Sequence, residues 1–453
     1  MLFFPQISLA LSSLSLISFS LALSPRWLLS SQQHWTDIWT ATPFSAPVVN
    51  LPSGFNQTGA AFSNTTLRQT VHVTLGAPQI RITLSNNFGN QALNVTHMTV
   101  AYPDIINGDG NATGINSGTG SPSIITSSVQ TVTFSGNETI SIPNGALAKT
   151  DPINMPVDSQ SQIAISIYTS TGQGGTNITG HLSSFTTTWF AQGDQTTTSD
   201  ISTVDTVKSG QQWYFISAVE GWVGPQQSSL AIIGDSITDG VGSTPNGNNR
   251  WTDQLFARMQ SEGDSVAKNV AIANQAWNGN KVLFDGSGAS AISRVERDVL
   301  AQSGIAYAMV FDGVNDIGHT DDNVEDQQAK YDSLIQGYEQ IITRIHAFGI
   351  PVFGATITPS NGPDYNATLG KYSGRVREQY RQKINDWIRN SGKYDYVVDF
   401  DAAVRNTTAP YQINSTLGIG DYLHFNPMGY RLFAEAFDLS VFSRFQGGVS
   451  GYQ

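Results

Sequence analysis

Residues 230–240 read LAIIGDSITDG, an apolar run followed by a turn of small polar residues. Such a run is typical of a buried strand that ends at a tight turn. Further apolar runs lie at 270–273, 306–311, 351–357 and 396–400. Between them, apolar residues recur at helical spacing, which predicts βαβ units and a parallel sheet between helical layers. The residues at helical spacing are Trp251, Leu255 and Met259, and then Tyr331, Leu334, Tyr338, Ile341, Ile342 and Ile345.

Residues 33–222 have a different pattern, in which apolar and polar residues alternate in short runs separated by Gly, Pro and Asn. This period of two predicts antiparallel strands, arranged as a β-sandwich. Residues 221–227, GWVGPQQ, read as the linker to an α/β domain at 229–442. The β-sandwich is expected to have a structural or a glycan-binding role. Its alternating runs include Val71-Val73-Leu75, Ile82-Leu84, Met98-Val100-Tyr102 and Ile163-Ile165-Ile167.

The composition excludes several classes of partner and site. The formal net charge of the 453-residue chain is −12, so neither a nucleic acid nor an anionic membrane surface would be attracted to it. No cysteine is present, which excludes disulfides, a thiol nucleophile and thiolate metal ligands. We therefore expect a neutral ester or polysaccharide substrate rather than a charged macromolecule.

The N-terminal residues predict export from the cell. Residues 1–22 are apolar, are interrupted by serines and end at a small-x-small site, as in a cleaved signal peptide. No later stretch approaches the roughly 20 apolar residues that a membrane span needs. Many N-glycosylation sequons accompany this leader, and together they predict a secreted, extracellular glycoprotein. The sequon asparagines are Asn56, Asn64, Asn94, Asn111, Asn137, Asn177, Asn366, Asn406 and Asn414.

Ser236 is the first candidate for chemistry, because it follows a predicted strand at the edge where parallel sheets place working groups. A lone serine in a strand-to-helix turn is more often a helix cap than a nucleophile. A serine nucleophile also needs a base, which is almost always histidine. Four histidines lie in the β-rich half and His346 lies inside a predicted helix, which leaves His319 and His424.

His424 stands three residues after Asp421, in a loop rich in Gly, Asn and Pro. This spacing lets one loop present a carboxylate to the imidazole that it orients. Two solvated loop residues are the ordinary alternative. His319 follows Asn315 and Asp316 and could line the same cleft, but no acid is comparably placed to orient it.

Acyl transfer also needs hydrogen-bond donors aimed at the developing oxyanion. The N–H groups of Ser236 and Gly279 and the side-chain amide of Asn315 all follow successive predicted strands. A turn glycine and a loop-capping amide are the alternatives for Gly279 and Asn315 when each is taken alone. Their joint placement favours an oxyanion hole.

These blocks resemble the SGNH, or GDSL, hydrolases, over about residues 229–442. The resembling segments are Gly234-Asp235-Ser236, Gly279, Gly313-Val314-Asn315-Asp316 and Asp421-Tyr422-Leu423-His424. The resemblance implies a flavodoxin-like α/β/α fold. It also implies Ser236 as nucleophile, His424 as base, Asp421 as orienting acid, and an oxyanion hole made by Ser236, Gly279 and Asn315. The opening QHWTDIWTATP is similar to that of a secreted two-domain branch of these enzymes.

The chain departs from the family pattern at two blocks. Ala276 and Trp277 stand where the family often has a glycine and an aliphatic residue, and Phe425 stands where a proline is common. We expect Trp277 and Phe425 to shape the substrate pocket, although core packing explains both equally well. Asp235 and Asp239 have no histidine cluster or further carboxylate pattern beside them, so no metal and no other cofactor is predicted.

The leading prediction is a secreted serine ester hydrolase that works through an acyl-enzyme and removes short acyl groups, such as acetyl, from carbohydrate esters. One alternative is a lipase or acylhydrolase on lipid esters. Another is a non-catalytic carbohydrate-binding wall glycoprotein that has kept the fold. Intact Ser236, Asn315, Asp421 and His424 favour an enzyme.

Overall fold

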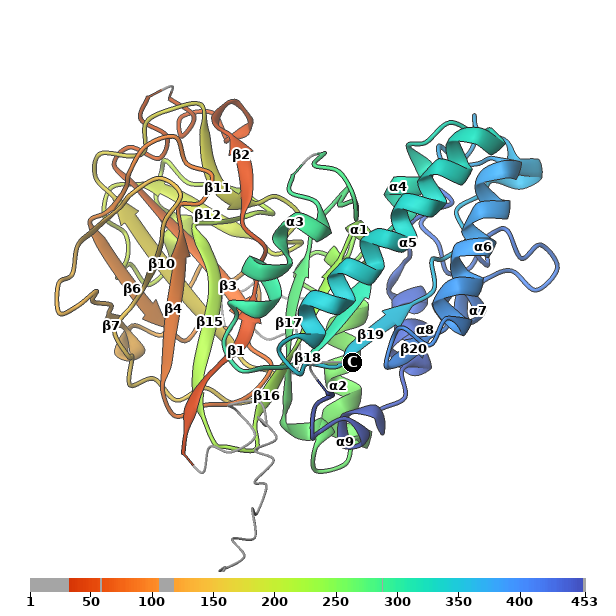
Figure 1. Cartoon of the computed structure of the whole chain (residues 1–453). Coiled ribbons are helices and arrows are strands. Elements are labelled where there is room, and N and C mark those ends of the chain that lie inside the picture. The colour runs from red at the N-terminus through yellow and green to blue at the C-terminus, as the bar shows by residue number, and fades with distance from the viewer. Residues whose placement is uncertain (1–31, 58, 106–117, 287, 451–453) are drawn as a thin grey trace, which may run out of the picture.

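The computed structural model describes residues 32–57, 59–105, 118–286 and 288–450 (Figure 1). The predicted signal peptide at 1–22 and the sequon at Asn111 lie outside these ranges. None of the other eight sequon asparagines is buried. Within the described residues, no helix combines the length and the apolar composition that crossing a bilayer requires.

The second half of the chain contains a five-stranded parallel sheet whose strand order is β17-β16-β18-β19-β20. The first strand in the chain, β16, lies inside the sheet with β17 on one side and β18 on the other, so the strand order reverses there. Ligands of open α/β sheets bind outside the carboxyl ends of the strands at such a reversal. The strands are β16 (Ser228–Gly234), β17 (Val270–Ala276), β18 (Ile305–Phe311), β19 (Val352–Ala355) and β20 (Tyr396–Val398).

Helices cover this sheet in two groups, which confirms the predicted α/β/α fold. α5 packs against α3 and α6, whereas α8 packs against α2 and α7. In α2, Trp251, Leu255 and Met259 are buried, as their helical spacing predicts. The longer helices are α2 (Trp251–Glu262), α5 (Val324–His346), α6 (Arg375–Asn390) and α8 (Pro427–Ala436). The short ones are α1 (Ser236–Asp239), α3 (Ala291–Val295), α4 (Val314–Gly318), α7 (Phe400–Val404) and α9 (Val441–Arg444).

The N-terminal half is built from antiparallel sheets whose apolar side chains share one hydrophobic core, as the alternating pattern predicts. A four-stranded sheet contains β1 (His34–Thr40), β15 (Ile216–Val223), β4 (Ile80–Ser85) and β9 (Leu147–Lys149). A six-stranded sheet contains β13 (Lys208–Gly210), β12 (Thr188–Gln192), β3 (Thr65–His72), β10 (Gln162–Thr169), β6 (His97–Ala101) and β7 (Gln130–Thr131). Two smaller sheets contain β14 (Trp213–Tyr214), β11 (Asn177–His181) and β2 (Phe44–Pro47), and β5 (Leu93–Val95) with β8 (Ile140–Ile142).

The two halves are packed side by side, because β1 runs next to β17, the edge strand of the parallel sheet (Figure 1). The Thr40 hydroxyl donates to the Asn274 carbonyl at 3.0 Å, and Asp37 N–H donates to the Ser303 carbonyl at 2.9 Å. β15 ends at Val223 and β16 begins at Ser228, so only a short turn connects them. The N-terminal half thereby covers the strand that leads to Gly279.

Candidate active site

The nucleophile candidate sits in the turn between β16 and α1. The Asp235 carboxylate caps α1 by accepting from Ile237 N–H at 2.9 Å, as expected of an Asp at this position. A Cβ on Gly234 would lie 2.6 Å from the Thr238 hydroxyl, so only glycine permits the chain to turn this tightly. The helix then ends at Gly240, which has a φ of 103°. The turn therefore holds Ser236 at the carboxyl edge of the sheet.

Ser236, His424 and Asp421 form a continuous hydrogen-bonded chain. Ser236 Oγ lies 2.7 Å from His424 Nε2, and His424 Nδ1 lies 2.5 Å from Asp421 Oδ2. The other Asp421 oxygen accepts the backbone N–H groups of Leu423 and His424. Burial raises the pKa of Asp421, but the hydrogen bonds from His424 outweigh burial and lower that pKa to about 2. The ionised carboxylate thus places the imidazole proton on Nδ1, which leaves Nε2 to accept from the serine.

The three predicted oxyanion donors lie along one hollow. Ser236, Gly279 and Asn315 all line it, and its volume is about 240 Å³. Gly279 has a φ of 82°, a conformation that favours glycine. Within the described residues, the N–H groups of Ser236 and Gly279 donate no hydrogen bond to the protein. Both donors remain available to a bound group.

Asn315 is held by two neighbours that the sequence patterns do not reveal. Its Nδ2 donates to the Asn280 carbonyl at 2.8 Å, and the Tyr372 hydroxyl donates to its Oδ1 at 2.6 Å. These bonds fix which end of the amide carries the N–H groups and leave one N–H for a ligand. Tyr372 lies 57 residues after Asn315, in a loop without a recognisable motif.

Arg294 forms hydrogen bonds that stabilise the turn containing Gly279. Its buried guanidinium donates to the Gln275 carbonyl at 2.6 Å and to Asn280 Oδ1 at 2.6 Å, and it pairs with Asp298 at 2.9 Å. These contacts join the end of β17 to α3 and hold the turn in place. Sequence reasoning missed Arg294, because a lone arginine in a helix carries no signal of its long-range partners.

The other predicted residues differ in where they lie, because His319 lines the hollow whereas Trp277 and Phe425 are buried. His319 lines the same hollow, as its position suggested, and its Nδ1 lies 2.9 Å from the Asn315 carbonyl. Burial lowers the pKa of His319. Trp277 is 3% exposed and its ring packs on Phe44, with the ring centroids 3.9 Å apart. Phe425 is fully buried against Tyr430 and Phe433, so it belongs to the core and not to the substrate pocket.

Three buried carboxyls lie at the ends of β16 and β18. Burial raises the pKa of Asp235 to about 7 and that of Asp316 to about 6, and it also raises the pKa of Asp312. Asp316 accepts the N–H groups of Val282 and Leu283, which links α4 to the segment after Gly279. Over the described ranges, no cluster of three or more His, Asp or Glu side chains is arranged to hold a metal ion.

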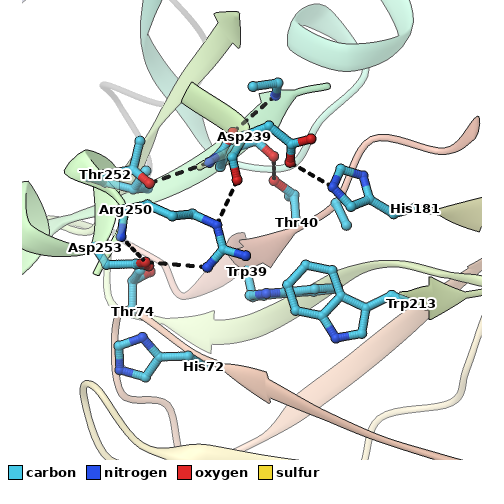
Figure 2. A pocket seen from close by; sticks show the side chains of 14 residues that line it. Trp39, Thr40, His72, Thr74, His181, Trp213, Asp239, Arg250, Thr252 and Asp253 are labelled. Atoms are coloured by element: carbon cyan, nitrogen blue, oxygen red, sulfur yellow. Dashed lines mark hydrogen bonds and ion pairs between the residues drawn. The ribbon is translucent and has the colours of Figure 1, made fainter. Parts of the chain in front are cut away.

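Side chains from both halves of the protein line a small cavity of about 50 Å³ (Figure 2). His181, at the end of β11, contacts Asp239 of α1 across this junction, with His181 Nε2 2.8 Å from Asp239 Oδ1. Arg250 donates to the Asp239 backbone carbonyl at 2.9 Å and pairs with Asp253 at 3.3 Å. The N-terminal half therefore contacts the turn that carries the nucleophile candidate.

The His181–Asp239 pair predicts a pH-dependent stability. Burial lowers the pKa of His181, but the charge and hydrogen bond of Asp239 outweigh burial and leave the pKa above its usual value. The stability from this pair is fully present below about pH 6.5 and is lost as the pH rises through the folded pKa. We expect Asp239→Asn to lower the free energy of unfolding by roughly 3 kcal/mol at pH 5.5 and by much less at pH 9. Urea unfolding at both pH values measures this difference.

Asp253→Asn is the matched control for this prediction. Asp253 lines the same cavity, but its partner Arg250 keeps its charge at both pH values. The destabilisation of this variant should therefore differ little between pH 5.5 and pH 9. An Asp239→Asn effect that is equally large at both pH values would show that the protonated His181 is not the source of the stability.

Part of the chain is similar to a known protein family. Residues 232–432 match the family model described as GDSL-like lipase/acylhydrolase. No curated protein matches the chain significantly. A solved GDSL-like lipase from Bacteroides thetaiotaomicron is 14% identical and aligns over 48% of this chain and 89% of its own, with a TM-score of 0.33. An acetylxylan esterase from Geobacillus stearothermophilus, solved as a catalytic mutant, is 20% identical and aligns over 46% of this chain and 92% of its own, with a TM-score of 0.34. Residues 232–432, which include Ser236, Asn315 and His424, are a GDSL-like lipase/acylhydrolase domain.

Proposed function

We propose that this protein is a secreted serine ester hydrolase that removes short acyl groups, such as acetyl, from carbohydrate esters. The observation that carries the proposal is the hydrogen-bonded chain from Ser236 through His424 to Asp421, next to three donors on one hollow. This arrangement contains every part that acyl transfer to serine requires. The match of residues 232–432 to an acylhydrolase family supports it.

Acylation begins when Ser236 Oγ attacks the carbonyl carbon of the ester. His424 Nε2 takes the serine proton at the same time, and the ionised Asp421 stabilises the imidazolium that forms. The carbonyl oxygen becomes an oxyanion that accepts from the N–H groups of Ser236 and Gly279 and from the Asn315 amide. The intermediate then collapses, His424 gives its proton to the leaving alcohol, and the acyl group stays on Ser236.

Deacylation repeats these steps with water. His424 takes a proton from the water as its oxygen attacks the acyl carbonyl, and the same three donors bind the second oxyanion. Collapse releases the free acid and returns the proton to Ser236 Oγ. The chain of hydrogen bonds is restored, and one water molecule has been consumed.

The lining of the hollow favours a short acyl group on a polar alcohol. Polar side chains dominate its lining, which includes Lys281, His319 and Lys371. A long acyl chain would bury apolar surface poorly there and would desolvate charged groups at a cost. An acetyl group needs no apolar tunnel.

Secretion is supported by the N-terminal pattern and by the sequons. Residues 1–22 have the pattern of a signal peptide. Every sequon asparagine in the described ranges is at least partly exposed and so accessible to glycosylation.

Hydrolysis of a substrate panel tests the proposal. The panel contains p-nitrophenyl acetate, butyrate, octanoate and palmitate, together with acetylated xylan for acetate release. We expect activity on the acetate ester and on acetylated xylan, and a fall in kcat/KM as the acyl chain lengthens. Rates that rise with chain length would favour a lipase instead. Absence of hydrolysis across the panel would contradict the proposed carbohydrate-ester activity.

A further inference from the structure

A second hollow opens beside the one that contains Ser236. It is lined by Phe44, Leu182, Ser183, Asp239, Trp277 and Gly279, among others, and we call it the junction subsite. Its volume is about 250 Å³. Asn278 and Gly279 line both hollows, so a group whose carbonyl oxygen lies at Gly279 N–H is next to both. One ester molecule can therefore extend from the nucleophile into the junction subsite.

The N-terminal half supplies one wall of the junction subsite. Phe44 belongs to β2, and Leu182 and Ser183 directly follow β11, which pairs with β2. The opposite wall comes from Asp239 on α1 and from Trp277 after β17. Contact between the Phe44 and Trp277 rings joins the two walls. The acylhydrolase domain alone would leave this hollow open on one side.

The junction subsite also has polar side chains that a ligand can reach. Ser183 is partly exposed and Asn278 is exposed, and both line the hollow. A long acyl chain bound here would take these groups out of water without giving them a partner, which is unfavourable. A ligand with hydroxyl groups can form hydrogen bonds with both.

A sugar ring has the required chemistry. Its hydroxyl groups both donate and accept, and its C–H faces pack on aromatic rings such as Phe44. The volume is slightly below the roughly 300–1,000 Å³ typical of sites for drug-sized ligands, which suits one ring better than a long chain. Polar groups beside an aromatic wall, in a hollow of this size, favour a glycan ester over a lipid ester.

We propose that the junction subsite binds one sugar ring of the glycan whose ester is cleaved at Ser236. The Ser183 hydroxyl and the Asn278 amide form hydrogen bonds with ring hydroxyls, and Phe44 forms the apolar wall. This inference rests on the proposed function and makes the N-terminal half a determinant of substrate choice. It assigns to Phe44, Leu182 and Ser183 a role that no motif in the sequence indicates.

Selectivity between two acetate esters tests the inference. Ser183→Phe places a ring in the hollow, and we expect it to lower kcat/KM for acetylated xylotetraose, relative to kcat/KM for p-nitrophenyl acetate, by roughly tenfold or more. Ser183→Ala leaves the hollow open but removes the hydroxyl, and should lower the same ratio by about fivefold. Ser127→Phe makes the same substitution at an exposed position in the 126–128 turn, which packs on β6, and should leave the ratio unchanged. An unchanged ratio in both subsite variants would overturn the inference.

A binding measurement on a variant that cannot cleave the ester tests this inference independently of the proposed function. Isothermal titration of the Ser236→Ala protein with unesterified xylotetraose measures the subsite directly. We expect binding that Ser183→Phe weakens by roughly tenfold and that Ser127→Phe leaves in place. If the wild type cleaves no ester but this pattern holds, the proposed reaction fails while the subsite stands. If esters are cleaved but xylotetraose does not bind, the subsite is overturned.

Discussion

Ser236→Ala should reduce kcat for p-nitrophenyl acetate by about 10⁶-fold, which is the scale seen when a serine nucleophile is removed from a hydrolase that works through an acyl-enzyme. The variant keeps the oxyanion donors but has no oxygen to attack the carbonyl, so only background rate enhancement by binding remains. The hydroxyl that is lost contacts His424, Ser236 as a whole is 3% exposed, and alanine fits the space. Steady-state kinetics, with circular dichroism to check the fold, measure this effect.

Ser229→Ala is the matched control for this substitution. Ser229 lies near the start of β16, at the opposite end of the strand from Ser236, and it is fully buried. The same loss of one hydroxyl there should change kcat by less than about twofold, because it leaves the geometry of the site in place. If Ser236→Ala retained a substantial part of the wild-type rate, another group would have to be the nucleophile.

The sequence predicts the strands of the parallel sheet and the polar residues that directly follow them. Apolar runs followed by Gly, Asn or Asp mark the strands β16, β17 and β18, because a buried parallel strand needs apolar side chains on both faces. Ser236, Gly279 and Asn315 follow from that pattern, since the carboxyl ends of parallel strands meet at one edge. The closeness of Asp421 and His424 follows from their separation of three residues in one loop.

Contacts between distant segments are the part that the sequence does not predict. Phe425 looks like a pocket residue, because it follows His424, yet the loop turns its ring into the core formed with Phe433. His181 lies in the β-rich half and has no motif, but the packing of β1 along β17 brings it to Asp239. Such partners depend on how the two halves of the chain meet, and local periodicity carries no signal of that packing.

Asp421→Asn should lower kcat by about 10⁴-fold near neutral pH, with a much smaller effect on KM. The wild-type carboxylate accepts from His424 Nδ1 and so keeps Nε2 free to take the serine proton. An amide can instead donate to Nδ1, which places the imidazole proton on Nε2 and blocks the transfer from Ser236. Asn Oδ1 can still accept the N–H groups of Leu423 and His424, so the loop should keep its shape. Steady-state kinetics at pH 7 measure the loss, and thermal unfolding checks the fold.

The double variant Ser236→Ala with Asp421→Asn shows whether Asp421 acts through the nucleophile. Residues that act as one unit are strongly non-additive, so the double variant should be no slower than Ser236→Ala alone. A role for Asp421 in holding the loop would instead produce a further loss, because a displaced loop also impairs substrate binding. Within the described residues, no carboxylate other than Asp421 contacts His424. A rate for Asp421→Asn within tenfold of the wild type would therefore mean that the backbone alone orients the imidazole, and Asp421 would then serve the loop rather than the reaction.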